Sequence, residues 1–215
     1  MIRKDIDSFV KTIPNNVQLV VASKYLNIQE MQELLDHNIH HFGENRVDSF
    51  LTKYQYFSNQ KIIWHFIGHL QRNKAKLVAN KIDFLHSLDS LELAKILNDL
   101  QVKPLPVFIE VSINKEETKN GVLPEDLNGF IQKLLVFKKI QIVGLMMMGK
   151  DHSSEKELHH QFSSLKTLKL QVEKDLSIQI PYLSMGMSND YLIAIEEGAT
   201  HIRLGRIITN EKGHN

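Results

Sequence analysis

The sequence predicts a single-domain α/β protein with the (β/α)8, TIM-type barrel fold and an extra helix at the N-terminus. Short apolar runs rich in β-branched residues alternate with segments of helical spacing, and eight such runs occur in 215 residues. This alternation is typical of parallel strands joined by crossovers, and eight units suit a closed barrel. An open, doubly wound sheet alternates in the same way, so the strand count alone does not exclude it.

The predicted strands share an apolar, β-branched composition and are bounded by polar residues. They cover residues 17–23, 39–43, 62–68, 83–88, 105–111, 140–147, 181–186 and 201–205. No linker rich in Pro, Gly or Ser separates them, so we expect residues 1–215 to form one domain.

Helical spacing is clearest in three of the intervening segments, which are 28–37, 90–100 and 155–172. Pro124 suits the first turn of a further helix over 123–135. Residues 69–82 show a weaker pattern that is still compatible with a short helix, and residues 9–16 resemble the end of the extra N-terminal helix.

Composition excludes several classes of function. The net charge is +1, from 26 basic and 25 acidic residues, which gives no electrostatic footprint for nucleic acid. Cysteine is absent, which excludes disulfides and thiol catalysis. The N-terminus lacks the apolar core of a signal peptide, and no apolar run approaches the roughly 20 residues of a membrane helix. We therefore expect a cytoplasmic protein that binds neither nucleic acid nor membrane.

Lys24 is the most unusual residue of the first strand segment, because it follows the apolar run Val20–Ala22 almost directly. Residue type alone favours a buried salt bridge. A lysine at a strand end inside an enclosed site also suits Schiff-base chemistry, because burial favours the neutral amine that attacks a carbonyl. Polar residues follow the other strands too, and in a parallel barrel all these ends meet on one face.

The last two strands suggest an anion site. Small residues recur at Ser184, Gly186 and Ser188, before a helix expected from about Asn189. Backbone N–H groups there, together with a second turn at Gly205–Arg206, would suit one phosphate group. Tight turn packing is an equally good explanation. We expect Arg203 to point into the barrel mouth, where a heteroaromatic nitrogen is a plausible acceptor.

The histidines and methionines suggest no metal centre. His65 and His69 lie on a strand-to-loop segment, and the pairs His40–His41 and His159–His160 suit surface or half-buried positions. No histidine–carboxylate cluster has metal-ligand spacing. Met146–Met148 suit core filling or the apolar wall of a site.

Several motifs together resemble the pyridoxal phosphate homeostasis protein family. They are VVASK, FGENR, WHFIGHLQRNK, LHSLDS, EETKNG, GLM and SMGMSNDYLIAIEEGATHIRLG, which extend over about residues 17–208. The resemblance implies a barrel like the N-terminal domain of alanine racemases, which holds pyridoxal 5′-phosphate (PLP) as an internal aldimine.

Position by position, the resemblance implies a role for each residue of the site. Lys24 would form the aldimine, and Asn45 would lie near the ring. Ser188, the backbone of Met187 and the turn at Gly205 and Arg206 would hold the phosphate. Arg203 would face the pyridine nitrogen, and because an arginine does not readily protonate that nitrogen, the ring would be a poor electron sink. The chain departs from the family pattern at Asn27, at Ser112 and over Ile207–Asn210.

Two classes of function follow. The first is a non-catalytic PLP carrier that buffers supply of the cofactor, with PLP-dependent apo-enzymes as candidate partners. The second is a PLP-dependent amino-acid racemase, which needs a second acid/base from a C-terminal β-domain of a partner subunit. The chain ends soon after the last strand, so we expect neither that domain nor its dimer contact, and we favour a monomeric carrier. A Schiff-base aldolase is a third class that Lys24 alone would permit.

Overall fold

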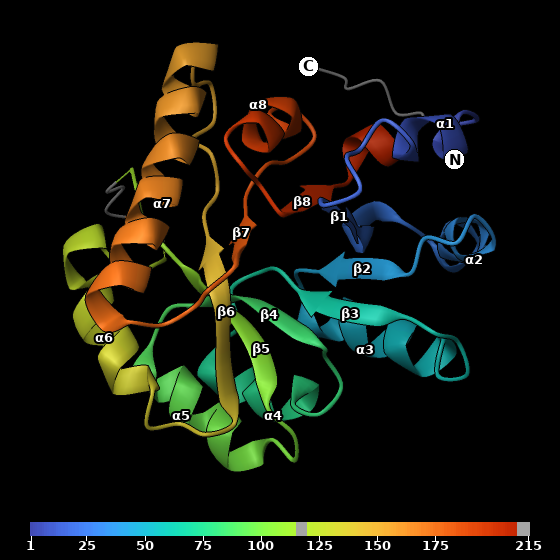
Figure 1. Cartoon of the computed structure of the whole chain (residues 1–215). Coiled ribbons are helices and arrows are strands. Elements are labelled where there is room, and N and C mark those ends of the chain that lie inside the picture. The colour runs from blue at the N-terminus through green and yellow to red at the C-terminus, as the bar shows by residue number, and fades with distance from the viewer. Residues whose placement is uncertain (115–119, 210–215) are drawn as a thin grey trace.

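The computed structural model describes residues 1–114 and 120–209, and its centre is a closed barrel of parallel strands (Figure 1). The strands are β1 (Gln18–Ala22), β2 (His41–Glu44), β3 (Ile63–Phe66), β4 (Phe84–Leu88), β5 (Leu105–Glu110), β6 (Ile140–Met146), β7 (Tyr182–Ser184) and β8 (His201–Leu204). Each strand pairs with the next, and β8 pairs with β1 through partners such as Leu19 and Ile202. That closing pair confirms the barrel and excludes the open sheet.

Helices surround the barrel on the outside (Figure 1). They are α1 (Ile6–Val10), α2 (Ile28–Asp36), α3 (Val47–Tyr56), α4 (Ala75–Val78), α5 (Leu91–Leu100), α6 (Leu127–Leu134), α7 (Glu155–Leu176) and α8 (Tyr191–Glu196). Capping boxes fix two helix starts: Asn27 and Glu30 satisfy each other's backbone N–H groups at α2, and Ser154 and Glu157 do so at α7. The departure at Asn27 thus provides a helix cap.

The apolar side chains form two cores. The larger lies between the strands and the helices and includes Phe42, Phe50 and Phe162. The smaller contains Phe108, Val143 and Met146 with Phe84 against them, all on strands. Apolar burial between layers provides most of the driving force for such a fold.

The helix predictions differ from the structure in two places. The helix α3 was not predicted, although Val47, Phe50, Leu51 and Tyr54 have helical spacing. The short helix considered for residues 69–82 is confirmed as α4, which follows a 3-10 turn at Arg72–Lys74. The last helix begins at Tyr191 rather than Asn189, because Asp190 occupies the N-cap position.

The C-terminal departure Ile207–Asn210 is described as far as Thr209, and Asn210 lies outside the described residues. Ile2 forms an antiparallel bridge with Thr209, and the Arg3 N–H donates to the Ile208 carbonyl oxygen at 3.1 Å. The segment after β8 is therefore fastened to the start of the chain.

No helix in the described part of the chain is long and apolar enough to cross a bilayer.

Candidate functional site

A cavity of about 610 Å³ opens at the carboxyl ends of the strands. Every residue that the sequence analysis assigns to the site lines it: Lys24, Asn45, Met187, Ser188, Arg203, Gly205 and Arg206. These residues come from the ends of β1, β2, β7 and β8 and the segments after them, which the closed barrel brings to one face.

Lys24 lies two residues beyond β1, in a 3-10 turn formed by Ser23–Tyr25. Its side chain is exposed to the cavity, with Nζ 4.7 Å from the centroid of the Tyr25 ring. No carboxylate of the described residues lies within ion-pair distance of Lys24. Both the buried salt bridge and the expected burial of this lysine are therefore wrong, since the amine faces open space.

A buried ion pair supports the segment that carries Lys24. Glu44, at the end of β2, accepts hydrogen bonds from Ser23 Oγ at 3.0 Å and Ser49 Oγ at 3.1 Å, and it pairs with Lys53 of α3. Lys53 Nζ also donates to the backbone carbonyl oxygen of Ser23. The residue next to Lys24 is thus held from both its side chain and its backbone.

Asn45 follows β2 and presents an unpaired acceptor. Its Oδ1 atom is buried and has no hydrogen-bond partner in the described structure, which is costly in an interior and is normally relieved by a ligand or water. Gly68 packs against the Asn45 backbone so closely that a Cβ there would lie 2.4 Å from the Asn45 carbonyl oxygen. That contact fixes where Asn45 lies.

Ser188 brings the two predicted anion turns together. Its Oγ atom accepts hydrogen bonds from the backbone N–H groups of Gly205, at 3.2 Å, and Ile207, at 3.4 Å. The turn after β7 and the turn after β8 are therefore adjacent, as a shared phosphate site requires.

Gly186 and Ser184 are absent from the lining of the cavity, so neither belongs to the anion turn as predicted. Gly186 has a φ of +93°, and a Cβ there would lie 2.6 Å from the Ala194 side chain, so only glycine fits. Ser184 is fully buried inside the barrel.

The Met187 backbone N–H is already paired, because it donates to Asp190 Oδ1. Burial raises the pKa of Asp190, and hydrogen bonding from Met187 opposes that effect. Met187 lines the cavity, as expected, but its N–H group is occupied in this structure.

Arg203 lies on β8 with only 5% of its surface exposed. Its Nη1 atom donates to Ser184 Oγ at 2.6 Å and its Nη2 atom donates to the Met147 carbonyl oxygen at 2.9 Å. Burial lowers the pKa of Arg203 to about 10, and the carboxylates of Glu110 and Asp190 oppose the shift. The guanidinium therefore remains charged at neutral pH while it lines the cavity.

Glu110, at the end of β5, is a cavity residue that sequence reasoning missed. Burial raises the pKa of its carboxyl group, and the nearby Asp89 adds to this effect. It ends an apolar run, as Lys24 nearly does, and that position was the signal that could have identified it.

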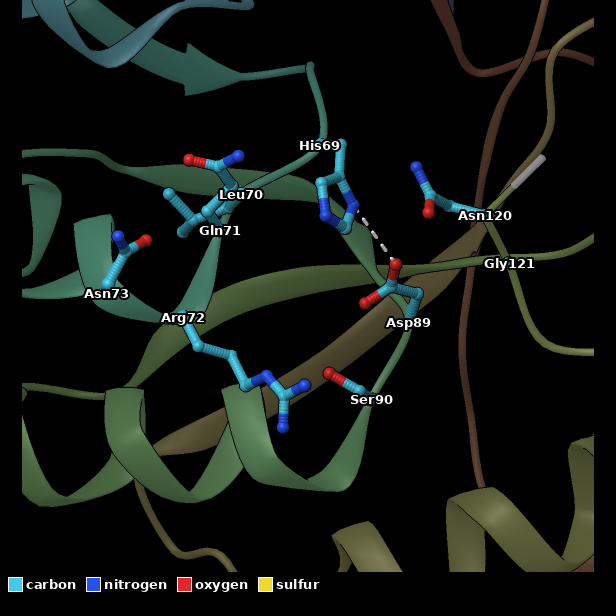
Figure 2. A pocket seen from close by; sticks show the side chains of 9 residues that line it. All are labelled: His69, Leu70, Gln71, Arg72, Asn73, Asp89, Ser90, Asn120 and Gly121. Atoms are coloured by element: carbon cyan, nitrogen blue, oxygen red, sulfur yellow. Dashed lines mark ion pairs between the residues drawn. The ribbon is translucent and has the colours of Figure 1, made fainter. Parts of the chain in front are cut away.

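A second cavity, of about 700 Å³, adjoins the first, since His69 and Asn120 line both. Figure 2 shows His69 facing Asp89, with Nδ1 3.2 Å from Oδ2. Ser112 lies near this region and its N–H donates to the Val122 carbonyl oxygen, but residues 116–119 of the EETKNG motif lie outside the described residues.

The barrel and its cavity define the class of protein. The family model described as "Alanine racemase, N-terminal domain" matches residues 2–211. Within that class, the chain belongs to the pyridoxal phosphate homeostasis protein family. It is 35% identical to the member from Aquifex aeolicus over 92% of this chain and 88% of that protein, and 34% identical to the member from Vibrio alginolyticus over 94% and 89%.

Solved structures agree with this assignment. PipY of Synechococcus elongatus without PLP superposes with a TM-score of 0.91 at 29% identity, over 97% of this chain and all (100%) of that chain. PipY with PLP bound gives a TM-score of 0.88 over 95% and 98%. An alanine racemase of Clostridium difficile shares the fold alone, with a TM-score of 0.78 at 14% identity over 96% of this chain and 57% of the racemase.

Proposed function

We propose that this protein binds PLP through a covalent bond to Lys24 and holds it for PLP homeostasis in the cytoplasm, without catalytic turnover. The observation that carries the proposal is one cavity that brings together a lysine without a carboxylate partner among the described residues, two adjacent anion turns and a buried arginine. The structure of PipY with PLP bound, and the homeostasis name of the relatives, support it.

PLP supplies an electrophilic aldehyde, with which the neutral amine of a lysine reacts. Two lysines, Lys24 and Lys150, line the cavity, and among the described residues neither lies within ion-pair distance of a carboxylate. Lys24 is the one carried by the turn that directly follows β1. The support beneath Ser23 keeps the backbone next to Lys24 in place, so the amine is aimed by a rigid element.

Ser188, Gly205 and Arg206 would hold the phosphate. The hydroxyl of Ser188 is a suitable donor for a phosphate oxygen, and Arg206 adds a positive charge at the rim. The N–H groups of Gly205 and Ile207 donate to Ser188 Oγ in this structure and hold that hydroxyl in place. Met187 would contribute its surface to the cavity wall, because its N–H group is bonded to Asp190.

Asn45 supports the fit of an oxygen-rich aromatic ligand. Its buried Oδ1 atom lacks a donor in the described structure, and a ligand hydroxyl would satisfy it. The unsatisfied Asn45 Oδ1 atom, which packing within the protein does not explain, therefore supports the fit of PLP to this cavity.

The position of Arg203 favours a protein that holds PLP without catalysing a reaction on it. A charged guanidinium donates hydrogen bonds to a pyridine nitrogen but does not readily give up a proton to it. A ring nitrogen without a proton would make PLP a weak electron sink, and carbanion chemistry needs a strong one.

A racemase-like enzyme is the second candidate, because Glu110 places a carboxyl group in the cavity that Lys24 lines. The strands β1 and β5 are opposite each other in the closed order, so Glu110 and Lys24 approach from opposite walls. A positioned acid/base contributes typically 10²–10⁴-fold to a rate.

Residues 1–215 would act as one monomeric PLP-binding domain, with PLP-dependent apo-enzymes as the recipients of the cofactor.

Absorbance after incubation with PLP tests the cofactor, and racemisation of amino acids tests turnover. We expect a yellow protein whose rate with amino acids does not exceed that of free PLP. A protein that stays colourless with PLP would refute binding. Turnover that is lost in Glu110→Gln and in Lys24→Ala would establish the enzyme instead.

A further inference from the structure

A line of hydrogen bonds runs through the barrel interior from Arg203 to His41. Arg203 Nη1 donates to Ser184 Oγ at 2.6 Å, and Ser184 Oγ lies 2.8 Å from His86 Nδ1. His86 Nε2 lies 2.8 Å from His65 Nδ1, and His65 Nε2 lies 3.0 Å from His41 Nδ1. The line starts at the guanidinium that lines the candidate site.

The interior of this line is shielded from water. Ser184, His86 and His65 are each 0% exposed. His65 stacks on Phe84 with ring centroids 4.7 Å apart, and His86 stacks on Phe108 at 4.3 Å. Within the described residues these histidines form no cluster that could hold a metal ion. Instead, the ring nitrogens of His65 bond to His86 and His41, and those of His86 bond to His65 and Ser184.

His41 ends the line at the opposite mouth of the barrel. It is half-buried and lines a cavity of about 610 Å³ at the amino ends of the strands, together with His40 and Lys61. Four basic groups face His41: the preceding residue His40, His65 on β3, His201 on β8, and Lys61 before β3. The strand β1 and the helix α1 contribute only uncharged residues to this cavity, which are Gln18, Leu19 and Val10. No carboxylate of the described residues lines this cavity, so protonation of His41 has no counter-ion there.

The donor direction of the neutral line is fixed by Ser184. The Ser184 oxygen accepts a hydrogen bond from Arg203. Ser184 has one hydroxyl proton to donate, and among the described residues its acceptor is His86 Nδ1. His86 must then carry its proton on Nε2 and donate to His65 Nδ1, and His65 must donate from Nε2 to His41 Nδ1. Every bond therefore donates away from Arg203.

Protonated His41 is incompatible with that direction, because both of its ring nitrogens are then donors. His41 Nδ1 must donate to His65 Nε2, which moves the His65 proton to Nδ1 and, in turn, the His86 proton to Nδ1. Ser184 Oγ then accepts from His86 as well as from Arg203, and its O–H group keeps its proton but must rotate away from His86 Nδ1.

We propose that Ser184, His86 and His65 are positioning residues that couple Arg203 to His41, so that uptake of one proton from solvent at His41 reverses the line and turns Ser184, the hydrogen-bond partner of the guanidinium, from a donor to His86 into an acceptor from it. This goes beyond the proposed function, because it concerns the chain without cofactor. It makes one end of the barrel responsive to conditions at the other.

Side-chain ¹⁵N NMR of the full-length protein without added PLP tests the proposal. At pH 7.5 we expect His65 and His86 both to carry their proton on Nε2. As the pH falls through the titration of His41, both should switch to Nδ1 together, and the side-chain N–H signals of Arg203 should move with the same midpoint. Unchanged His65 and His86 signals while His41 titrates would overturn the proposal.

Variants separate coupling from packing. Ser184→Ala removes the link to the guanidinium, so the histidine switch should persist while the Arg203 signals lose the step. His41→Gln should abolish the step at every position. The control is His201→Gln, since His201 lies in the same interior but bonds to Thr200 Oγ1 at 3.0 Å instead of joining the line. The His201→Gln variant should keep the pH-dependent change in the His65, His86 and Arg203 signals. If the Arg203 signals still change with pH in Ser184→Ala, the proposed coupling through Ser184 is wrong.

Discussion

Lys53 donates a hydrogen bond from Nζ to the backbone carbonyl oxygen of Ser23, and the two atoms are 2.5 Å apart. Through this bond a lysine on α3 fixes the residue that precedes Lys24. The same ammonium pairs with Glu44, which in turn accepts from the Ser23 hydroxyl. The position of the candidate PLP lysine thus depends on a second, buried lysine.

Removal of this support should be costly. We expect Lys53→Met to lower the free energy of unfolding by about 3–5 kcal/mol, because it leaves the Glu44 carboxylate buried without its counter-ion. Urea unfolding measures the change. Lys74→Met is the matched control: Lys74 pairs with Asp48 at 3.4 Å on the surface, and such pairs contribute about 0–1 kcal/mol. Equal effects of the two substitutions would contradict the role given to Lys53.

Gly68 should tolerate no side chain. A Cβ there would lie 2.6 Å from the Asn45 Cα, so Gly68→Ala must displace backbone beside the cavity. We expect a loss of about 1–3 kcal/mol in stability and weaker PLP binding. In Gly129→Ala on α6 the new Cβ has nothing within 4 Å, and it should stabilise by about 0.5–1 kcal/mol. Thermal melting of both variants checks the prediction, which fails if Gly68→Ala melts like the wild type.

Ser188→Ala should weaken PLP binding about tenfold, because a lost hydrogen bond of about 1–1.5 kcal/mol corresponds to that factor. The substitution removes the acceptor shared by the N–H groups of Gly205 and Ile207. Titration with PLP, followed by absorbance, measures the affinity. Ser163→Ala on the exposed side of α7 serves as the control and should bind like the wild type. Unchanged affinity in Ser188→Ala would remove this residue from the phosphate site.

Buried histidines should make the protein sensitive to acid. Burial lowers the pKa of His201 from 6.5 to about 4, and it also lowers the pKa values of His41, His65 and His86. The unfolded chain therefore takes up protons that the folded chain refuses, so stability present above pH 6.5 is lost as the pH falls towards 4. His201 alone should account for about 3 kcal/mol.

Urea unfolding between pH 7.5 and pH 4 measures this loss. His201→Gln should flatten the pH dependence, and a slope that is unaffected by the substitution would show that the acid sensitivity has another source.

Glu110 should have the opposite dependence. Burial raises the pKa of its carboxyl group, so the folded protein binds this proton more tightly than the unfolded chain, and the favourable contribution is lost as the pH rises through the folded pKa. We expect Glu110→Gln to raise the melting temperature at pH 8 and to leave it nearly unchanged at pH 4. A lower melting temperature at pH 8 would show that the charged carboxylate stabilises the fold.

The barrel and its strand ends were predictable because they depend on local patterns. Apolar runs and helical spacing indicate eight parallel strands, and a barrel brings their carboxyl ends together whatever the details of packing. The motifs at Lys24, Ser188 and Arg203 identify cavity residues for that reason.

The polar interior was not predictable from such patterns. His86 and Ser184 form a hydrogen bond although 98 residues separate them in the sequence. Nothing in the local sequence of either strand shows that the two side chains meet. The burial of Lys53 on α3 was not predictable either, because its partner Glu44 lies at the end of β2. Polar groups buried in pairs are decided by tertiary contacts, which sequence periodicity does not contain.

The most direct test of the central claim is to locate the cofactor on the chain. After incubation with PLP, borohydride reduction and proteolysis, mass spectrometry should place the phosphopyridoxyl group on Lys24. Lys24→Ala should remove that label and the visible absorbance, whereas Lys74→Met should keep both. A label on another lysine, or visible absorbance that persists in Lys24→Ala, would contradict the claim that Lys24 is the attachment point.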